Sequence, residues 1–271
     1  MTPQEILINR LRKLCQADER IVAALLYGSF TTGEADAFSD IECVLFFDPQ
    51  VLSTLNKRAW VDQLAPTLLF FADDFGHYTA LFDNLVRGEF HFDSADDMRK
   101  VESWKGNAWF PSVKSTLLVD RTGTLAEALR PLIGAPVDRD NLQTVERLIN
   151  NFVNLMVFGM NTWQRGEFAR SHELLQNVHR FLEWMVRLLE HQTTHWPTPS
   201  KCLEKELSAQ SYARLVSCTS ALDPASLRNA YQNSWLWGQE LVAQLRERYH
   251  VTLPPDLFTQ IDAKFFEAFS T

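Results

Sequence analysis

Apolar positions in the first 120 residues follow helical spacing in some segments and strand-like runs in others. Residues 4–16 repeat apolar side chains at helical intervals, which predicts a helix. A second helix is expected over residues 50–64, before Pro66. Short apolar runs bounded by turn residues predict strands. The predicted strands are residues 21–27, 40–47, 67–72, 78–83, 86–92 and 115–120.

The pattern changes to helical spacing alone after a Gly- and Pro-containing linker at residues 134–140. Asp223 and Pro224 form an N-cap and first-turn proline. Helices are expected over residues 141–165, 167–192, 200–207, 209–221, 224–249 and 255–269. We therefore predict an α+β chain: a domain with a mixed sheet and helices over residues 1–134, then a C-terminal helical bundle over residues 135–271.

Composition narrows the class of protein. The chain has 271 residues, and 46% of them are hydrophobic, which is enough for a sizeable core. The formal charge is −8, from 26 Lys and Arg against 34 Asp and Glu, without a basic block. We therefore expect no nucleic-acid partner.

The sequence features that indicate a cellular compartment agree with one another. The N-terminus lacks the unbroken apolar segment of a secretion signal, and no run of 18 apolar residues predicts a membrane span. The four cysteines are scattered and form no Cys-x-x-Cys pair, which argues against a disulfide framework or a structural zinc site. We expect a soluble, cytoplasmic protein with no membrane partner.

Candidate chemistry lies between the first two predicted strands, in the stretch YGSFTTGEADAFSDIE. Gly28 permits backbone conformations closed to other residues, and the amides after it, with the Ser29 hydroxyl, can hold an anionic oxygen. Asp40 and Glu42 are two residues apart on a predicted strand and point to the same face. Two adjacent carboxylates repel each other unless a cation lies between them, and hard oxygen ligands suit Mg²⁺.

A third acid lies on a later strand. Residues 86–92 alternate strictly, so Arg87, Glu89 and His91 share the polar face. If this strand neighbours the strand of Asp40, the three acids converge, and one carboxylate can deprotonate an attacking hydroxyl. His91 either orients Glu89 or simply packs at the strand edge.

Each element has an ordinary structural explanation. Gly-Ser marks a simple turn, Asp-x-Glu a solvated strand edge, and Glu89 with its neighbours a surface ion-pair face. The order of the elements is the stronger signal: strand, Gly-Ser, short connector, strand with Asp-x-Glu, and a later strand with an acid.

This order resembles the nucleotidyltransferase superfamily that includes DNA polymerase β and the aminoglycoside nucleotidyltransferases. The segments YGSFTTGEADAFSDIE, LFDNLVRGEFHF, RGEFARSHELL and, less specifically, KCLEKELS are similar to those of the lincosamide nucleotidyltransferases. The resemblance runs over nearly the whole chain. It implies an antibiotic-resistance enzyme with a nucleotidyltransferase catalytic domain at residues 1–134 and a substrate- and nucleotide-binding helical domain at residues 135–271.

The resemblance implies transfer of a nucleoside monophosphate, AMP from ATP or another NMP from its triphosphate, onto a lincosamide hydroxyl. By the same resemblance, Gly28 and Ser29 hold the triphosphate, Asp40 and Glu42 bind Mg²⁺, and Glu89 is the general base. The second acid is Glu42 rather than the commoner Asp, which leaves one or two metal ions open.

Basic residues of the helical domain are candidates for phosphate contacts. Arg170 lies in the RGEFARS stretch and is favoured over Arg165 and Lys201, which are read as solvated helix positions. Glu167 is interpreted as a helix cap. His179 is interpreted as a core histidine.

Three alternatives stay open at this stage. An aminoglycoside nucleotidyltransferase would share the catalytic acids but bind a polycation. A non-catalytic nucleotide-binding module of the toxin–antitoxin type would keep the fold without needing a base. The apolar helical faces can pack within one chain or across a homodimer.

Overall fold

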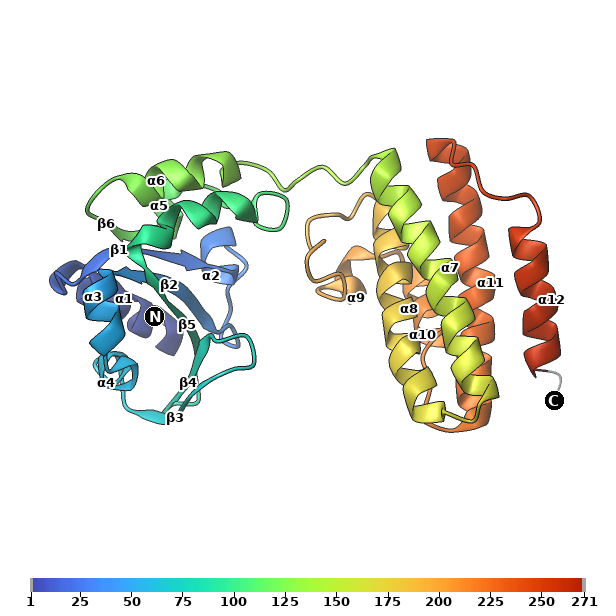
Figure 1. Ribbon diagram of the computed structural model, residues 1–271, viewed down its shortest axis with the longest axis horizontal. Helices are drawn as coiled ribbons and strands as arrows, with labels where there is room; N and C mark the ends of the chain where they lie inside the picture. The colour runs from blue at the N-terminus through green and yellow to red at the C-terminus, as the bar shows by residue number, and fades with distance from the viewer. Residues whose placement is uncertain (1, 270–271) are drawn as a thin grey trace. The chain divides into compact units, whose positions relative to one another are not determined.

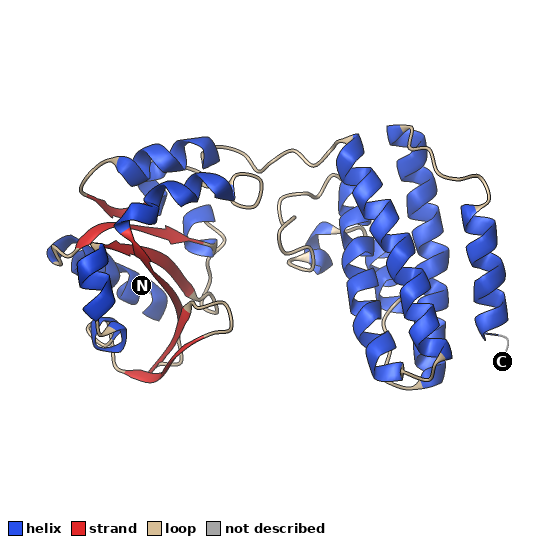
Figure 2. Ribbon diagram, viewed as in Figure 1, coloured by secondary structure: helices blue, strands red, loops and turns tan. Residues whose placement is uncertain are grey.

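The computed structural model describes residues 2–269 and divides between Val137 and Asp138 into two compact units. The first unit combines a sheet with helices, and the second is helical (Figures 1 and 2). The predicted fold class, an α+β domain with a mixed sheet followed by a helical bundle, is confirmed. Among the described residues, no helix combines the length and apolar character needed to cross a membrane.

Within residues 2–269, the strands form one six-stranded mixed sheet in the order β3-β4-β5-β2-β1-β6. The strands are β1 (Ile21–Tyr27), β2 (Ile41–Phe47), β3 (Thr67–Ala72), β4 (Tyr78–Phe82), β5 (Arg87–Ser94) and β6 (Leu117–Asp120). The central pair, β2 and β5, is parallel, and the other pairs are antiparallel. Two sequence-distant strands therefore meet in the middle of the sheet.

Each face of the sheet packs against different helices. One face packs on α1 (Pro3–Ala17) and α4 (Lys57–Val61) through a core of buried apolar side chains that includes Leu7, Leu11 and Trp60. The opposite face packs on the 3₁₀ helix η1 (Ala95–Trp104) and on α6 (Thr124–Leu129). Because helices cover both faces of the sheet, successive strand residues are buried on alternate faces and can all be apolar. This explains the continuous apolar runs IVAALL and CVLFF.

Strand predictions were accurate where apolar runs are bounded by clear turns. β1 has the predicted limits, and the alternation of residues 86–92 is confirmed by the burial of Gly88, Phe90 and Phe92 on one face of β5. Asp40 lies just before β2 rather than in it.

The predicted helix over residues 50–64 is wrong in its continuity. The chain forms α3 (Pro49–Thr54) and α4, separated by Leu55 in an extended conformation. Asn56 then caps α4, because its side chain accepts a hydrogen bond from the Ala59 amide at 3.0 Å.

The strand predicted over residues 115–120 is shorter. Ser112 caps a helical turn, α5 (Val113–Thr116), and β6 begins only at Leu117. Three elements had no sequence prediction: η1, α6 and the 3₁₀ turn η2 (Arg130–Leu132). A 3₁₀ helix has three residues per turn and therefore lacks the 3.6-residue period by which α-helices are predicted.

The helical unit is dominated by three long helices, α7 (Leu142–Gln164), α8 (Phe168–Leu189) and α11 (Pro224–Tyr249). Asp223 caps α11 with Pro224 in its first turn, as predicted. Shorter helices are α9 (Leu203–Glu206), α10 (Ala209–Ser217) and α12 (Leu257–Phe269). α9 begins later than predicted because Cys202 adopts a left-handed conformation.

Glycines allow the long helices to approach closely. A Cβ on Gly238 of α11 would lie 2.0 Å from Cζ of Phe152 on α7. A Cβ on Gly159 of α7 would lie 2.0 Å from the Tyr231 hydroxyl oxygen, whose proton is donated to the Ser171 carbonyl of α8 at 2.6 Å. These contacts fix how the three helices pack on one another.

Candidate active site on the sheet face

Four neighbouring strands place a row of polar side chains on one face of the sheet. Glu42 of β2 is directly opposite Glu89 of the parallel strand β5. Tyr27 of β1 is opposite Glu42, and Thr79 of β4 is opposite Glu89. Cross-strand partners point to the same face, so the four side chains form one row. β5 is thus the neighbour of β2, which is the condition under which the sequence predicts that the acids converge.

The turn after β1 is built around Gly28. Its backbone has φ +72° and ψ −156°, a conformation that residues with a Cβ rarely adopt. A Cβ at this position would lie 1.6 Å from Oε2 of Glu42, so the carboxylate packs directly on the glycine backbone. The short helix α2 (Ser29–Thr32) follows. Thr31 closes its turn by donating from N and Oγ1 to the Gly28 carbonyl at 3.0 and 2.7 Å. Gly28 therefore determines where the Glu42 carboxylate lies.

Arg87 connects two of the predicted acids. Its Nη1 donates to Oδ2 of Asp40, and its Nη2 donates to Oε2 of Glu89 at 2.9 Å. The side chains of Arg87 and Asp40 are 43% and 36% exposed, and that of Glu89 is 20% exposed. One guanidinium therefore supplies positive charge between two carboxylates.

Glu89 has further partners on its other oxygen. The Tyr27 hydroxyl donates to Oε1 at 2.7 Å, and Nε2 of His91 lies 3.2 Å from the same oxygen. Burial disfavours the charged carboxylate, but hydrogen bonds from Tyr27, Arg87 and His91 outweigh it and lower the pKa of Glu89 to about 2. Burial is also the main cause that lowers the pKa of His91. Glu89 is therefore ionised at neutral pH, and both of its carboxylate oxygens already accept hydrogen bonds.

The chemistry of the predicted acids suits Mg²⁺. Asp40, Glu42 and Glu89 offer only hard oxygen donors, which Mg²⁺ prefers. The Arg87 guanidinium is a stand-in cation between Asp40 and Glu89. A metal ion bound to Asp40 would have to displace it, and the three-acid metal site stays a prediction.

A different set of side chains meets the distance requirement of a metal site. Among residues 2–269, one group of three potential ligands has all its ligand atoms within 4.8 Å of one another: His77, Glu89 and His91. Asp40 and Glu42 are not part of that group.

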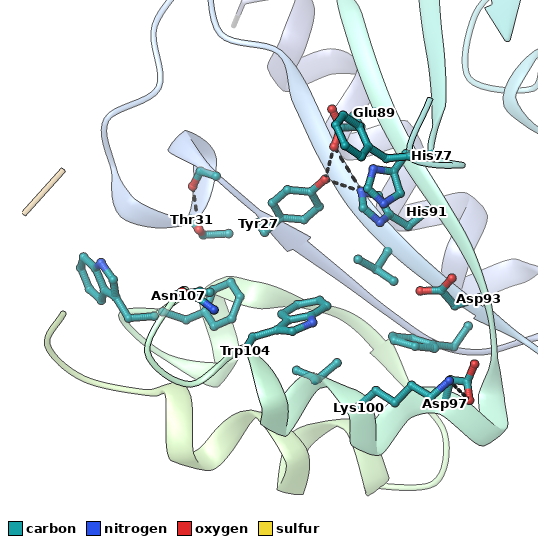
Figure 3. A pocket seen from close by; sticks show the side chains of 18 of the residues that line it. Tyr27, Thr31, His77, Glu89, His91, Asp93, Asp97, Lys100, Trp104 and Asn107 are labelled. Carbon is teal, nitrogen blue, oxygen red and sulfur yellow. Dashed lines mark hydrogen bonds and ion pairs between the residues drawn. The ribbon is translucent and has the colours of Figure 1, made fainter. Parts of the chain in front are cut away.

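A cleft of about 800 Å³ opens over this face within the N-terminal unit (Figure 3). It extends from the Gly28 turn to Glu89 and His91, and Trp104 and Asn107 lie across it from Tyr27 and Thr31. This volume is in the range of small-molecule sites.

One wall of this cleft is aromatic and basic and was not predicted from the sequence. Lys100, Trp104, Trp109 and Phe110 come from η1 and the segment after it. The sequence feature that could have indicated this wall is a pair of tryptophans, one on each side of Gly106, in a segment without helix or strand periodicity. Gly106 has φ +98°.

Arg170, the predicted phosphate contact, lies on α8 in the helical unit. Its Nη1 is 3.4 Å from Oε2 of Glu167, and its guanidinium lies 5.3 Å from the centre of the Phe158 ring. Glu167 occupies the N-cap position of α8, as interpreted, although its side chain makes no capping hydrogen bond. His179 is a buried core residue as expected, with Nε2 2.5 Å from the Cys218 carbonyl oxygen.

Comparisons with known proteins find one similar family and a similar solved structure. Residues 141–264 match the family model described as lincosamide nucleotidyltransferase-like, C-terminal domain. None of the curated proteins compared with the chain matches it. Among solved structures, the chain is similar to an aminoglycoside 6-adenyltransferase from Bacillus subtilis, with a TM-score of 0.47 and 13% identity over 99% of this chain and 98% of that one.

Proposed function

We propose, from the premise that residues 141–264 belong to the lincosamide nucleotidyltransferase-like C-terminal domain family, that this chain is an antibiotic-modifying nucleotidyltransferase. It transfers AMP from ATP to a hydroxyl of a lincosamide and releases pyrophosphate. The observation that carries the proposal is the placement of Glu42 opposite Glu89 on parallel strands, beside the glycine turn at Gly28. The cleft above this row has room for a nucleotide-sized ligand.

In this mechanism Glu89 is the general base. Its carboxylate takes the proton of the acceptor hydroxyl, the hydroxyl oxygen forms a bond to the α-phosphorus, and the bond from that phosphorus to the bridging oxygen of pyrophosphate breaks. Tyr27 holds Oε1 of Glu89 in place through its hydrogen bond of 2.7 Å. Arg87 now occupies Oε2, so its departure frees a lone pair and raises the basicity of Glu89.

Phosphate charge needs neutralisation. Mg²⁺ held by Asp40 and Glu42 would supply that charge and polarise the α-phosphate. The backbone after Gly28 and the Ser29 hydroxyl are the proposed triphosphate contacts. Residues 1–134 are the proposed catalytic domain, and residues 135–271 are proposed to add substrate and nucleotide contacts, with Arg170 as a phosphate contact.

The deciding experiment incubates the purified chain with ATP, Mg²⁺ and either lincomycin or an aminoglycoside, and weighs the products by mass spectrometry. A mass increase of one AMP on lincomycin supports the proposal. The same increase only on the aminoglycoside replaces the lincosamide assignment with the aminoglycoside alternative. If neither drug class gives metal-dependent release of pyrophosphate, nucleotidyl transfer is refuted. That result favours a non-catalytic nucleotide-binding module.

The role of Glu89 is tested separately. Glu89→Gln should lower turnover by about 10²-fold or more while drug affinity changes little, because proton transfer is lost and shape is kept. Glu19→Gln, at an exposed position after α1, is the matched control and should be fully active. Unchanged turnover in Glu89→Gln removes this residue from its role.

A further inference from the structure

His77, Glu89 and His91 lie together in the cleft wall, with their potential ligand atoms within 4.8 Å of one another (Figure 3). β4 and β5 are antiparallel, with Tyr78 opposite Phe90 and Thr79 opposite Glu89. His77 precedes β4 by one residue, and continuing this register places it beside His91. The two imidazole rings lie 3.7 Å apart at an interplanar angle of 26°.

The turn that presents His77 is tightly ordered by Asp73. Oδ1 of Asp73 accepts hydrogen bonds from the amides of Phe75 and His77, both at 2.9 Å. Oδ2 of the same carboxylate lies 3.8 Å from Nδ1 of His77. Many metal-binding histidines donate one ring N–H to a carboxylate that orients the ring, and Asp73 would take that role at His77 if this separation shortened to hydrogen-bond length.

The second half of the group is already at metal-site spacing. Nε2 of His91 and Oε1 of Glu89 are 3.2 Å apart, and the Tyr27 hydroxyl, 2.7 Å from each, holds them together. Tetrahedral ligands about 2.1 Å from a zinc ion lie about 3.4 Å from one another. Because the two imidazole rings are stacked, His77 must turn its ring to aim a nitrogen at the same ion. Its side chain is 37% exposed at the edge of the cleft, which leaves room for that rotation.

We propose that His77, Glu89 and His91 form a binding site for a divalent transition-metal ion of the zinc class. Two imidazoles and one carboxylate match zinc and its borderline neighbours, whereas Mg²⁺ selects oxygen ligands. Three protein ligands leave at least one position open toward the cleft. The site uses Oε1 of Glu89, while Oε2 stays with Arg87, so it is distinct from the Asp40 and Glu42 pair.

Metal binding is measured without nucleotide or antibiotic, so the result is independent of the proposed transferase function. The tag-free chain is stripped with a chelator, and Zn²⁺ is titrated in excess Mg²⁺ by calorimetry. One tightly bound equivalent is expected. Co²⁺ at the same site should give a visible absorption band that Zn²⁺ abolishes.

Variants assign the site. His77→Ala and His91→Ala should each weaken Zn²⁺ binding about tenfold or more, because each removes a direct ligand. His172→Ala, at a half-buried position of the helical unit, should bind Zn²⁺ as the parent does, and Cys202→Ser excludes the thiol that is not buried. Far-ultraviolet circular dichroism checks folding, and if His91→Ala is misfolded, the half-buried position His77 decides alone. Absence of tight Zn²⁺ binding, or parent-like affinity in His77→Ala, overturns the proposal.

Discussion

Replacing Gly28 by alanine probes the link between the glycine turn and the Glu42 carboxylate. The new Cβ would have to adopt φ +72° and ψ −156°, which costs about 1–3 kcal/mol of unfolding free energy. It would also stand 1.6 Å from Oε2 of Glu42, whereas real Cβ contacts lie beyond 3.0 Å. The carboxylate must therefore move, and a shift of about 1 Å at a reacting centre can lower a rate by about 10²-fold.

Gly33→Ala is the matched control for Gly28→Ala. Gly33 also has a positive φ, +81°, but a Cβ there would meet no atom within 4 Å. It should cost about 1–2 kcal/mol from backbone strain alone and leave nucleotidyl transfer nearly unchanged. Urea denaturation of the intact chain gives the stability change, and product formation from ATP and the drug gives the rate.

A double-mutant cycle separates strain from steric clash. In a Glu42→Ala background the clash is gone, so Gly28→Ala should cost about 1 kcal/mol less than in the parent. Equal costs in both backgrounds, or a transfer rate for Gly28→Ala equal to that of Gly33→Ala, would refute the argument that Gly28 positions Glu42.

Three further predictions concern charge and packing. The pKa of Glu89 is about 2 in the folded chain against an ordinary value of 4.5, so its ionised form adds stability above pH 4.5 that is lost as the pH falls toward 2; Arg87→Gln should raise that pKa and reduce the loss, measured as melting temperature across this range. Arg187→Ala should destabilise the helical unit by about 3–5 kcal/mol in urea denaturation, because a fully buried guanidinium and its bonds to three carbonyls and a carboxylate are lost. Gly238→Ala should lower stability by about 1–3 kcal/mol in thermal unfolding, because its Cβ would overlap Phe152.

Each of these predictions has a clear contrary result. An acid melting profile of Arg87→Gln identical to that of the parent would contradict its role at Glu89. Arg180→Ala, at an exposed position of the same helix, is the control for Arg187→Ala, and equal effects would refute the buried network. Alanine normally stabilises a helix relative to glycine by about 1 kcal/mol, so a gain in stability for Gly238→Ala would show that the helices do not pack as described.

Strong local patterns made much of the N-terminal unit predictable. The run over residues 21–27 is apolar and β-branched and ends at Gly28, so both ends of β1 could be located. The prediction of one helix over residues 50–64 failed because the apolar spacing is continuous, whereas the Asn56 side chain caps the start of a second helix. Apolar spacing alone does not show where a polar side chain will bond a backbone amide and end or begin a helix.

The sequence predicted only some of the residues and contacts of the candidate site. Alternation placed Glu89 on the polar side of its strand, but the position of the Arg87 guanidinium between Asp40 and Glu89 depends on side-chain conformation, which spacing does not encode. His77 went unnoticed because its partner His91 lies on the next strand, and only the antiparallel register joins them.

The guanidinium between Asp40 and Glu89 makes cation uptake at this point an exchange reaction. An incoming ion gains the carboxylate only as the arginine gives it up, so the apparent affinity of the resting protein for metal alone is weaker than its bare carboxylates would provide. A nucleotide that binds together with a metal ion brings a polyphosphate, and this anion can pair with the Arg87 guanidinium released from the carboxylates. Metal and nucleotide should therefore each strengthen the binding of the other.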